Sequence, residues 1–393
     1  MYAYPGIDNP SSTAQSPVLR TAEVRWSHTA PVRALRERLG DEPLALLTLF
    51  VSPMFDFEAV AAEAQREYPD CTVVACTTAG EIGQSGYDEG LMVATGYPRA
   101  DFACIAILID DLDSYDPQET IDRIAVNRVR LQEAHSDKPS SFAFLMVDGL
   151  SRREDVLSAT IAPALRDTPL FGASAGDGLD FRHTRVALNG LVREKAAVLM
   201  QVRSRHRMVV FSHDHFAPSD VRMVVTEADP ERRIVKSINA EPAAREYARI
   251  VGMDPEQLDR FTFAAHPVVV RLGDKHHVRA IQQVNDKGEL VFFSAIDEGM
   301  VLTVAHPQGM RENLLDLLET LSRDGRPSNV IACDCILRRI EAERSQEIRA
   351  LSGLLSDFNV TGFSTYGEQV GSLHVNQTMT GVAFYAGSGS AKK

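Results

Sequence analysis

Apolar runs of strand length alternate with helical patterns along most of the chain. Leu44–Val51 and Cys71–Thr77 are apolar enough for buried strands, and Phe57–Tyr68 between them has the spacing and propensity of a helix. The same order of strand, helix and strand returns twice, at 142–147, 153–165 and 170–171, and then at 330–336, 338–355 and from 360 onward. Three such segments predict degenerate internal βαβ repeats and an α/β layered fold.

Each repeat runs into a turn that is rich in hydroxyl groups or small residues and contains glycine followed by an acid. The acids are Glu81, Asp177 and Glu368, and the third turn also carries Ser364 and Tyr366. A carboxylate just past a buried strand lies where α/β proteins bind ligands, and it can hold an ammonium group while nearby hydroxyls hydrogen-bond. These five residues are therefore candidate ligand contacts. The alternative is that they satisfy the amides of their own turns, and three copies of one motif favour this structural role.

The middle of the chain has a different pattern. Short strand-like runs from Val209 onward lead to a helix at 241–250 and then to a meander that ends at Ala295. Hairpin signals such as Asn189-Gly190 indicate mixed sheets, so we expect an α/β protein of two portions with mixed β-sheets and flanking helices. The predicted order is a mobile N-terminal arm, two folded portions and a disordered tail, at 1–35, 36–220, 221–386 and 387–393.

Composition and charge restrict the classes of partner. The net charge of −13 disfavours nucleic acid and anionic lipid. No run reaches the roughly 18 apolar residues of a membrane span, and the first residues lack a signal-peptide pattern, so we expect a cytoplasmic protein without membrane insertion. The charged helix at 338–355 is expected to face solvent. Cys333 and Cys335 are expected to be small buried residues, with a metal or redox pair as the alternative.

The motifs occur in an order that resembles the FIST family of intracellular signal-transduction proteins, over about residues 40–385. They are Thr77–Glu81, Gly172–Asp177 and Asn189-Gly190 for the FIST N portion, and Glu241–Ala243, Phe263–Val270, Ile296–Gly299, Cys335–Arg339, Gly362–Glu368 and His374–Thr378 for the FIST C portion. The resemblance implies a sensory protein and not an enzyme. Small ligands such as amino acids are the ligands that it implies.

A branch of stand-alone FIST proteins that resembles this chain is similar to haem-based nitric-oxide sensors. That resemblance alone implies haem (heme) as cofactor and a histidine kinase or a cyclic-di-GMP enzyme as partner, with a homodimer as a further expectation. A haem sensor needs a neutral imidazole as axial ligand in an apolar pocket. His266, His374 and His183 are the candidates, and the alternative for each is a hydrogen-bonded structural histidine.

Two other motifs favour different chemistry. His213 and His215 would share one strand face at a spacing that a metal ion can use, but no third ligand is adjacent, and a polar strand edge is the alternative. Gly172-x-Ser174-x-Gly176 has the spacing of a nucleophile elbow, although hairpin signals and not a helix follow the serine. Three hypotheses remain: a haem-based nitric-oxide sensor, a haem-free amino-acid sensor and an esterase-like enzyme that uses Ser174.

Overall fold

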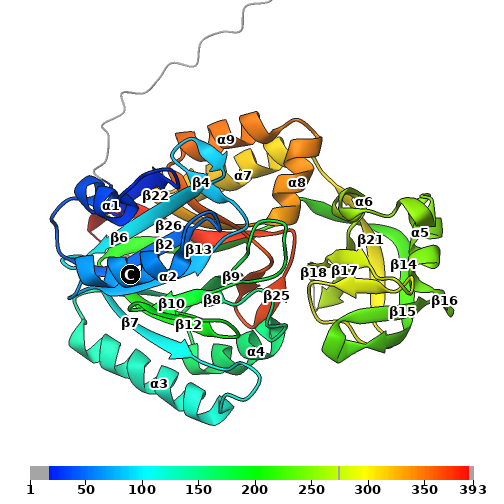
Figure 1. Cartoon of the computed structure of the whole chain (residues 1–393), viewed down its shortest axis with the longest axis horizontal. Coiled ribbons are helices and arrows are strands. Elements are labelled where there is room, and N and C mark those ends of the chain that lie inside the picture. Colours follow the sequence, from blue (N-terminus) through cyan, green and yellow to red (C-terminus); the bar gives the residue numbers. More distant parts are fainter. Residues whose placement is uncertain (1–16, 273–274, 389–393) are drawn as a thin grey trace, which may run out of the picture.

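The protein consists of a three-sheet body and a smaller lobe beside it (Figure 1). The structure is a computed structural model, and it describes residues 17–272 and 275–388. The predicted mixed α/β fold with internal repeats is confirmed, because strands and helices alternate in three successive units of the body. Residues 1–16 of the predicted N-terminal arm and residues 389–393 of the predicted tail lie outside the described residues. The rest of the predicted arm is folded and not mobile, because it contains a strand at 20–25, paired with 91–96, and the start of a helix at 31–39.

The three units of the body have the same order of elements. The first contains β1 (Arg20–Arg25), α1 (Pro31–Leu39), β2 (Leu44–Val51), α2 (Phe57–Glu67), β3 (Thr72–Thr77), β4 (Glu81–Gly83), β5 (Gly86–Asp88) and β6 (Leu91–Pro98). The second contains β7 (Phe102–Ile109), α3 (Pro117–Ala134), β8 (Ser140–Val147), α4 (Glu154–Leu165), β9 (Leu170–Ser174), β10 (Val186–Leu188), β11 (Leu191–Arg193) and β12 (Ala197–Ser204). The third contains β13 (His206–His213), α7 (Met310–Ser322), β22 (Asn329–Cys335), α8 (Ile336–Arg344), α9 (Ile348–Asp357), β23 (Val360–Thr365), β24 (Glu368–Val370), β25 (Leu373–Val375) and β26 (Met379–Ser388).

The units exchange their short hairpins. The β10–β11 hairpin of the second unit pairs with β3 of the first, β24–β25 of the third pairs with β9 of the second, and β4–β5 of the first pairs with β23 of the third. Each hairpin follows the acidic turn of its own unit, so all three turns lie at crossings from one sheet to the next. The exchange closes the three units into a ring.

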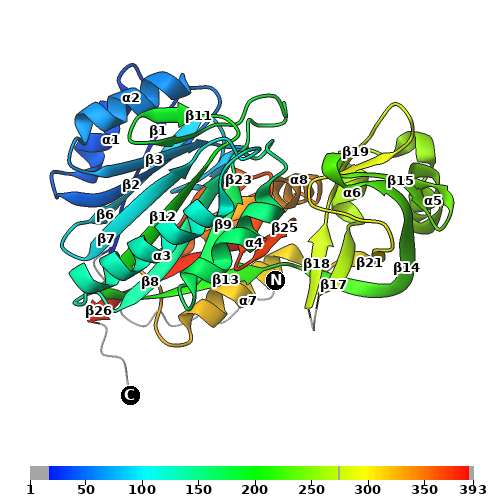
Figure 2. The ribbon, with the colours of Figure 1, turned by 90° about the horizontal axis from the view of Figure 1, so that it is seen from below.

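The inner faces of the three sheets enclose one aromatic core. Phe50 of the first unit stacks on Phe363 of the third with ring centroids 4.6 Å apart, and Phe144 stacks on Phe171 at 4.4 Å. Burying each such ring contributes about 1.5–3 kcal/mol. The outer faces are covered by helix pairs, α1 with α2, α3 with α4, and α7 with α9. Figure 2 shows the first two pairs on the outside of the body, and Figure 1 shows α7 beside α9. Apolar residues on both faces explain why the strands read as near-continuous apolar runs.

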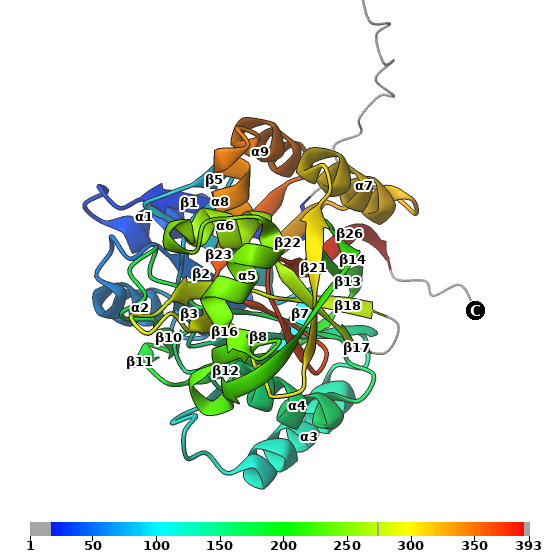
Figure 3. The ribbon, with the colours of Figure 1, turned by 90° about the vertical axis from the view of Figure 1, so that its right-hand side faces the viewer.

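The lobe is an insertion into the third unit, between β13 and α7 (Figure 3). Its elements are β14 (Phe216–Asp229), η1 (Pro230–Arg232), β15 (Ile234–Ile238), β16 (Glu241–Pro242), α5 (Ala243–Val251), η2 (Pro255–Gln257), α6 (Arg260–Ala265), β17 (Val268–Leu272), β18 (Lys275–Arg279), β19 (Ile281–Val284), β20 (Leu290–Phe292) and β21 (Val301–Pro307). It has a hydrophobic core of its own, in which Tyr247 and Phe263 are fully buried. The predicted second portion therefore contains the lobe and then returns to the body.

The segment predicted as one solvated helix at 338–355 is two helices, α8 and α9, and α8 is largely buried. Gln346 between them has a left-handed backbone with φ of 60°, which ends the first helix. Arg338 is only 1% exposed because its Nε donates to Asp334 at 2.7 Å and its Nη1 lies 2.6 Å from Nδ1 of His215. His215 comes from a distant segment, so the pattern of charges along the helix did not indicate burial.

Candidate functional site

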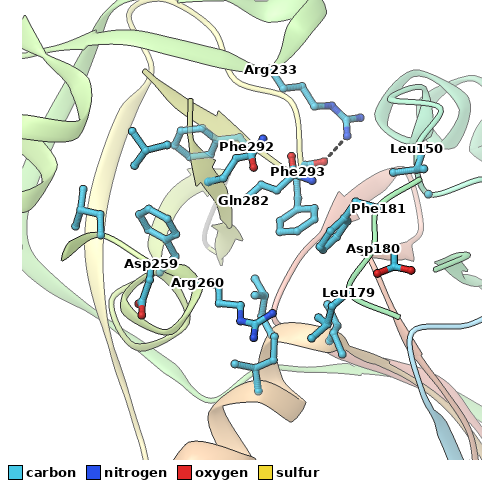
Figure 4. A pocket seen from close by; sticks show the side chains of 18 of the residues that line it. Leu150, Leu179, Asp180, Phe181, Arg233, Asp259, Arg260, Gln282, Phe292 and Phe293 are labelled. Carbon is cyan, nitrogen blue, oxygen red and sulfur yellow. Dashed lines mark hydrogen bonds between the residues drawn. The ribbon is translucent and has the colours of Figure 1, made fainter. Parts of the chain in front are cut away.

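A cavity of about 880 Å³ lies where the body meets the lobe (Figure 4). The body supplies the segment after β8, the segment after the second acidic turn and the start of α8. The lobe supplies the start of α6, β19 and the end of β20. The described lining residues are Gly149, Leu150, Arg152, Leu179, Asp180, Phe181, Arg233, Leu258, Asp259, Arg260, Phe263, Gln282, Gln283, Val284, Phe292, Phe293, Ile336, Leu337 and Ile340. We call this space the main cavity.

The second acidic turn positions one wall of the main cavity. Asp177 accepts hydrogen bonds from the backbone N–H groups of Phe181, Arg182 and His183 at 2.9, 2.7 and 2.7 Å. The hydroxyl of Tyr366, from the third unit, donates to the same carboxylate. This network fixes the loop at 178–183, which forms the wall. Asp177 and Tyr366 support that loop from behind and do not themselves line the cavity.

Aromatic rings form the apolar part of the site. Phe181 stacks on Tyr366 with centroids 4.5 Å apart, and Phe293 of the lobe lies 5.8 Å from Phe181. Figure 4 shows the rings of Phe181 and Phe293 side by side at the junction. An apolar or aromatic part of a ligand would therefore contact both the body and the lobe.

Charged side chains of both signs surround these rings. Arg152 and Arg260 are exposed and have no carboxylate partner within the described ranges, and Asp180 has no cationic partner there. Arg233 differs, because its Nη2 lies 2.6 Å from Glu154 and 2.9 Å from Asp155 of the body. Asp259 is also engaged, since it accepts from the backbone N–H of residue 262 at the start of α6. Arg152, Arg260 and Asp180 are thus the groups left to bind a ligand.

The acids of the first and third turns, Glu81 and Glu368, do not line the main cavity. Glu81 accepts from the hydroxyl of Thr78 and the N–H of Leu91, and burial raises the pKa of its carboxyl group to about 7. Glu368 accepts from Thr365 and from the N–H of Thr378 in the same way, and burial raises its pKa well above the usual range. Each acid connects its turn to the start of the closing strand, at Leu91 where β6 begins and at Thr378 just before β26.

Ser364 is the remaining residue of the predicted ligand set. It is fully buried, its backbone N–H donates to the carbonyl of Gly80, and its Oγ has no partner within the described residues. It lies at the crossing between the third and first units and does not line the main cavity. Of the five predicted contacts, the structure brings Asp177 and Tyr366 together behind the main cavity, whereas the other three do not line it.

The three predicted haem ligands lie at separate places. His374 is 2% exposed, its Nδ1 accepts from the side-chain amide of Gln369 at 3.1 Å, and burial lowers its pKa. Burial also lowers the pKa of His266, which follows α6. His183 is exposed and lies 3.5 Å from Glu194. None of the described residues that line the main cavity is a histidine, cysteine or methionine, so haem does not fit there for want of an axial ligand.

The two other sequence motifs have protein partners in the structure. Nε2 of His213 lies 3.1 Å from the carbonyl of Asn313, whereas His215 points to α8, and the described residues contain no group of three metal-ligating side chains. Ser174 is fully buried and its Oγ accepts from the amide of Gln369 at 3.0 Å. In a nucleophile elbow a helix follows the serine. Here the chain leaves β9 through the Asp177 turn and continues into β10, so the elbow is not formed.

Sequence reasoning missed Arg152, Asp180 and Arg260. They come from three segments that are distant in sequence, and they line one cavity only because the lobe folds back onto the second unit. One local signal was present: Asp180 lies three residues after Asp177, in the loop that the predicted turn supports. Nothing in the pattern near Arg260 distinguishes it from an ordinary surface arginine.

Comparison with known families gives an assignment that agrees with these motifs. The model for the FIST N domain matches residues 45–241 and the model for the FIST C domain matches residues 243–371. None of the curated proteins matches the chain. No helix within the described ranges is long and apolar enough to cross a membrane. FIST domains are sensory domains of signal-transduction proteins and bind small ligands. The two matches together span most of the sequence, and the chain therefore belongs to the FIST family.

Proposed function

We propose that this protein is a signal-input protein that binds a free amino acid in the main cavity. The observation that carries the proposal is the set of unpaired charges of both signs around an aromatic wall. Arg260 and Arg152 offer planar forks for a carboxylate, and Asp180 offers a carboxylate for an ammonium group. Phe181 and Phe293 would pack on an apolar side chain.

The position of the cavity suggests how binding becomes a signal. A ligand held by Asp180 of the body and Arg260 of the lobe bridges the two parts and favours the arrangement in which they are close. The lobe already contacts the body through the Arg233 ion pairs and through Nη1 of Arg279, which donates to the carbonyl of His374 at 3.1 Å. A partner histidine kinase or cyclic-di-GMP enzyme would read the change in arrangement.

A thermal-shift screen with the twenty standard amino acids, followed by calorimetry, tests the proposal. A bound amino acid raises the melting temperature by mass action. Asp180→Asn and Arg260→Gln are each expected to weaken binding at least about tenfold, because each removes a charge-assisted hydrogen bond. Arg245→Gln, at an exposed position of α5 outside the cavity, is the matched control. Unchanged affinity in both cavity variants would rule the proposal out.

A haem-based nitric-oxide sensor is the second candidate, and one observation favours it. A separate cavity of about 680 Å³ between β13, the β24–β25 hairpin and the β17–β18 hairpin is lined by His213, His276, His277 and several valines. Burial lowers the pKa of His213, which keeps its imidazole neutral, as an axial ligand must be. Bound haem would supply the iron that takes up nitric oxide. His213 would hold the group and the valines would exclude water.

An absorption spectrum separates the two candidates. Purified protein mixed with haemin should develop a Soret band that His213→Ala abolishes and His183→Ala retains, since His183 lies on the surface away from this cavity. A protein that takes up no haem leaves the amino-acid proposal as the only one of the two.

A further inference from the structure

Another cavity lies in the second unit, apart from the lobe, between α3, the end of α4, the start of β8 and the end of β12. Its volume is about 320 Å³ and it shares no lining residue with the main cavity. Figure 2 shows α3 and β12 on the body, away from the lobe. Three arginines line it: Arg128 from α3, Arg166 from the segment before β9, and Arg203 from β12. We call this space the arginine cavity.

None of these arginines has a carboxylate partner within the described part of the chain. Nε of Arg128 donates to the carbonyl of Ala164 and Nε of Arg203 donates to the carbonyl of His135, both at 3.2 Å. Each contact fixes the side chain and uses only one of the five donors of the guanidinium group. Unpaired guanidinium groups are unexpected in a chain with a net charge of −13, because acids are abundant on its surface.

The acids near the arginine cavity do not compensate these charges. Asp167 is the acidic residue among the described lining. Asp137 interacts electrostatically with Arg203 without forming an ion pair with it. Its carboxylate instead forms ion pairs with Lys138 at 3.0 Å and with Arg205 at 2.9 Å. Three guanidinium groups against one carboxylate leave a net charge of two positive units at the cavity.

A buried polar group marks a second feature of this cavity. Gln201 lines it and is only 3% exposed; its Nε2 donates to the carbonyl of Ile124 at 3.1 Å, and its Oε1 has no partner among residues 17–272 and 275–388. A buried acceptor without a hydrogen-bond donor costs about 1–3 kcal/mol of stability, unless another molecule donates a hydrogen bond to it. Leu131 of α3 and Leu165 at the end of α4 are buried and form an apolar floor beside it.

We propose that the arginine cavity binds a small phosphomonoester. Its phosphate group carries nearly two negative charges at neutral pH, which matches the excess of two positive charges, whereas a monocarboxylate would leave one uncompensated. The planar forks of Arg128, Arg166 and Arg203 suit phosphate oxygens. A hydroxyl group of the ligand would donate to Oε1 of Gln201, and its carbon skeleton would lie on the apolar floor. The site is independent of the main cavity and of the proposed function.

Calorimetry on the full chain with phenyl phosphate tests the site, with benzoate as the monocarboxylate probe. Phenyl phosphate is expected to bind and benzoate to bind at least about tenfold more weakly. Arg203→Gln and Arg166→Gln should each weaken phenyl phosphate binding about tenfold or more, since each removes a charge-assisted contact. Arg166 is exposed, so its variant keeps the fold even if Arg203→Gln does not. Arg130→Gln, exposed on the same helix and outside the cavity, should bind as the wild type does.

Three results would overturn the proposal. The first is no heat of binding with millimolar phenyl phosphate. The second is equal affinity in the wild type and in the Arg166→Gln and Arg203→Gln variants. The third is loss of binding in Arg260→Gln but not in Arg203→Gln, which would place the phosphate in the main cavity. Because none of these tests uses an amino acid, failure here leaves the proposed function untouched.

Discussion

Glu81 is fully buried, and its environment penalises the ionised carboxylate. Its pKa in the folded protein is about 7 against an ordinary value of 4.5, with burial as the main cause. As the pH rises from 4.5 to 7, the unfolded chain releases this proton before the folded chain does. The contribution of Glu81 to stability therefore falls across that window and remains lower above it.

Glu81→Gln should remove this dependence on pH, because glutamine imitates the protonated form. We expect the variant and the wild type to have similar free energies of unfolding at pH 4.5. At pH 8 the variant should be more stable by up to about 3 kcal/mol. Urea unfolding at both pH values measures the difference, with Glu133→Gln on the exposed face of α3 as the control. A gap of the same size at both pH values would contradict the assignment.

At the scale of single residues, the sequence identified the acids of the turns and favoured a structural role for them over ligand binding. Glycine, hydroxyl and acid in a repeated order are visible in the letters, and the alternative that the acids satisfy their own turns was stated from the same letters. The structure gives Glu81 and Glu368 matching sets of partners. Arg260 and Asp180, whose charges face the main cavity, belong to no motif in the sequence, so local sequence patterns could not identify them.

Among the elements, the loop at 178–183 depends on one side chain. Asp177 accepts from three consecutive backbone N–H groups, so Asp177→Ala should leave all three without an acceptor. We expect a loss of about 2–4 kcal/mol in unfolding free energy, at about 1 kcal/mol for each hydrogen bond. Amide hydrogen exchange at 181–183 should rise strongly.

Asp180→Ala is the control for this prediction, because Asp180 lies in the same loop and holds none of these amides. If exchange at 181–183 is the same in Asp177→Ala as in the wild type, the loop is fixed by other contacts. The stacking of Phe181 on Tyr366 would then be the first to examine.

The elements themselves were largely predictable, since strands covered on both faces give continuous apolar runs and the helices between them keep their spacing. The break between α8 and α9 was not, because Gln346 adopts a left-handed backbone that the helical pattern does not reveal. The burial of α8 was also missed, since its arginines find their partners in Asp334 and His215. Contacts with residues distant in sequence, and not local helix propensity, determine both the break and the burial of α8.

For the whole molecule, the contact between body and lobe rests on a buried ion pair. Arg233 of the lobe is 5% exposed and Glu154 of the body is 2% exposed, with Nη2 and Oε2 2.6 Å apart. Arg233→Gln should destabilise the protein by about 3–5 kcal/mol, because it leaves a buried carboxylate without its cation. Urea unfolding measures the loss.

The double variant Arg233→Gln with Glu154→Gln should recover much of that stability, since two neutral amides remain where one charge was left alone. Arg232→Gln, at the adjacent exposed position, should change stability by less than about 0.5 kcal/mol. A double variant no more stable than Arg233→Gln would show that the ion pair is not what joins the two parts.

The arrangement of the whole molecule was predicted only in part. The repeats indicated three similar units, and the change of pattern after 216 indicated a different middle segment. The ring of exchanged hairpins was not predictable, because a short hairpin pairs equally well with its own sheet or a neighbouring one by local rules.

This ring has a consequence for how the protein is made and how it can be cut. The edge of the first sheet stays open until residues 186–193 have been synthesised, and the β4–β5 hairpin has no partner strand until residues 360–365 have been made, late in synthesis. A fragment that ends before that strand would expose open edges, which invite pairing with other chains. Truncated versions should aggregate, whereas removal of the inserted lobe leaves every exchanged pairing of the ring in place.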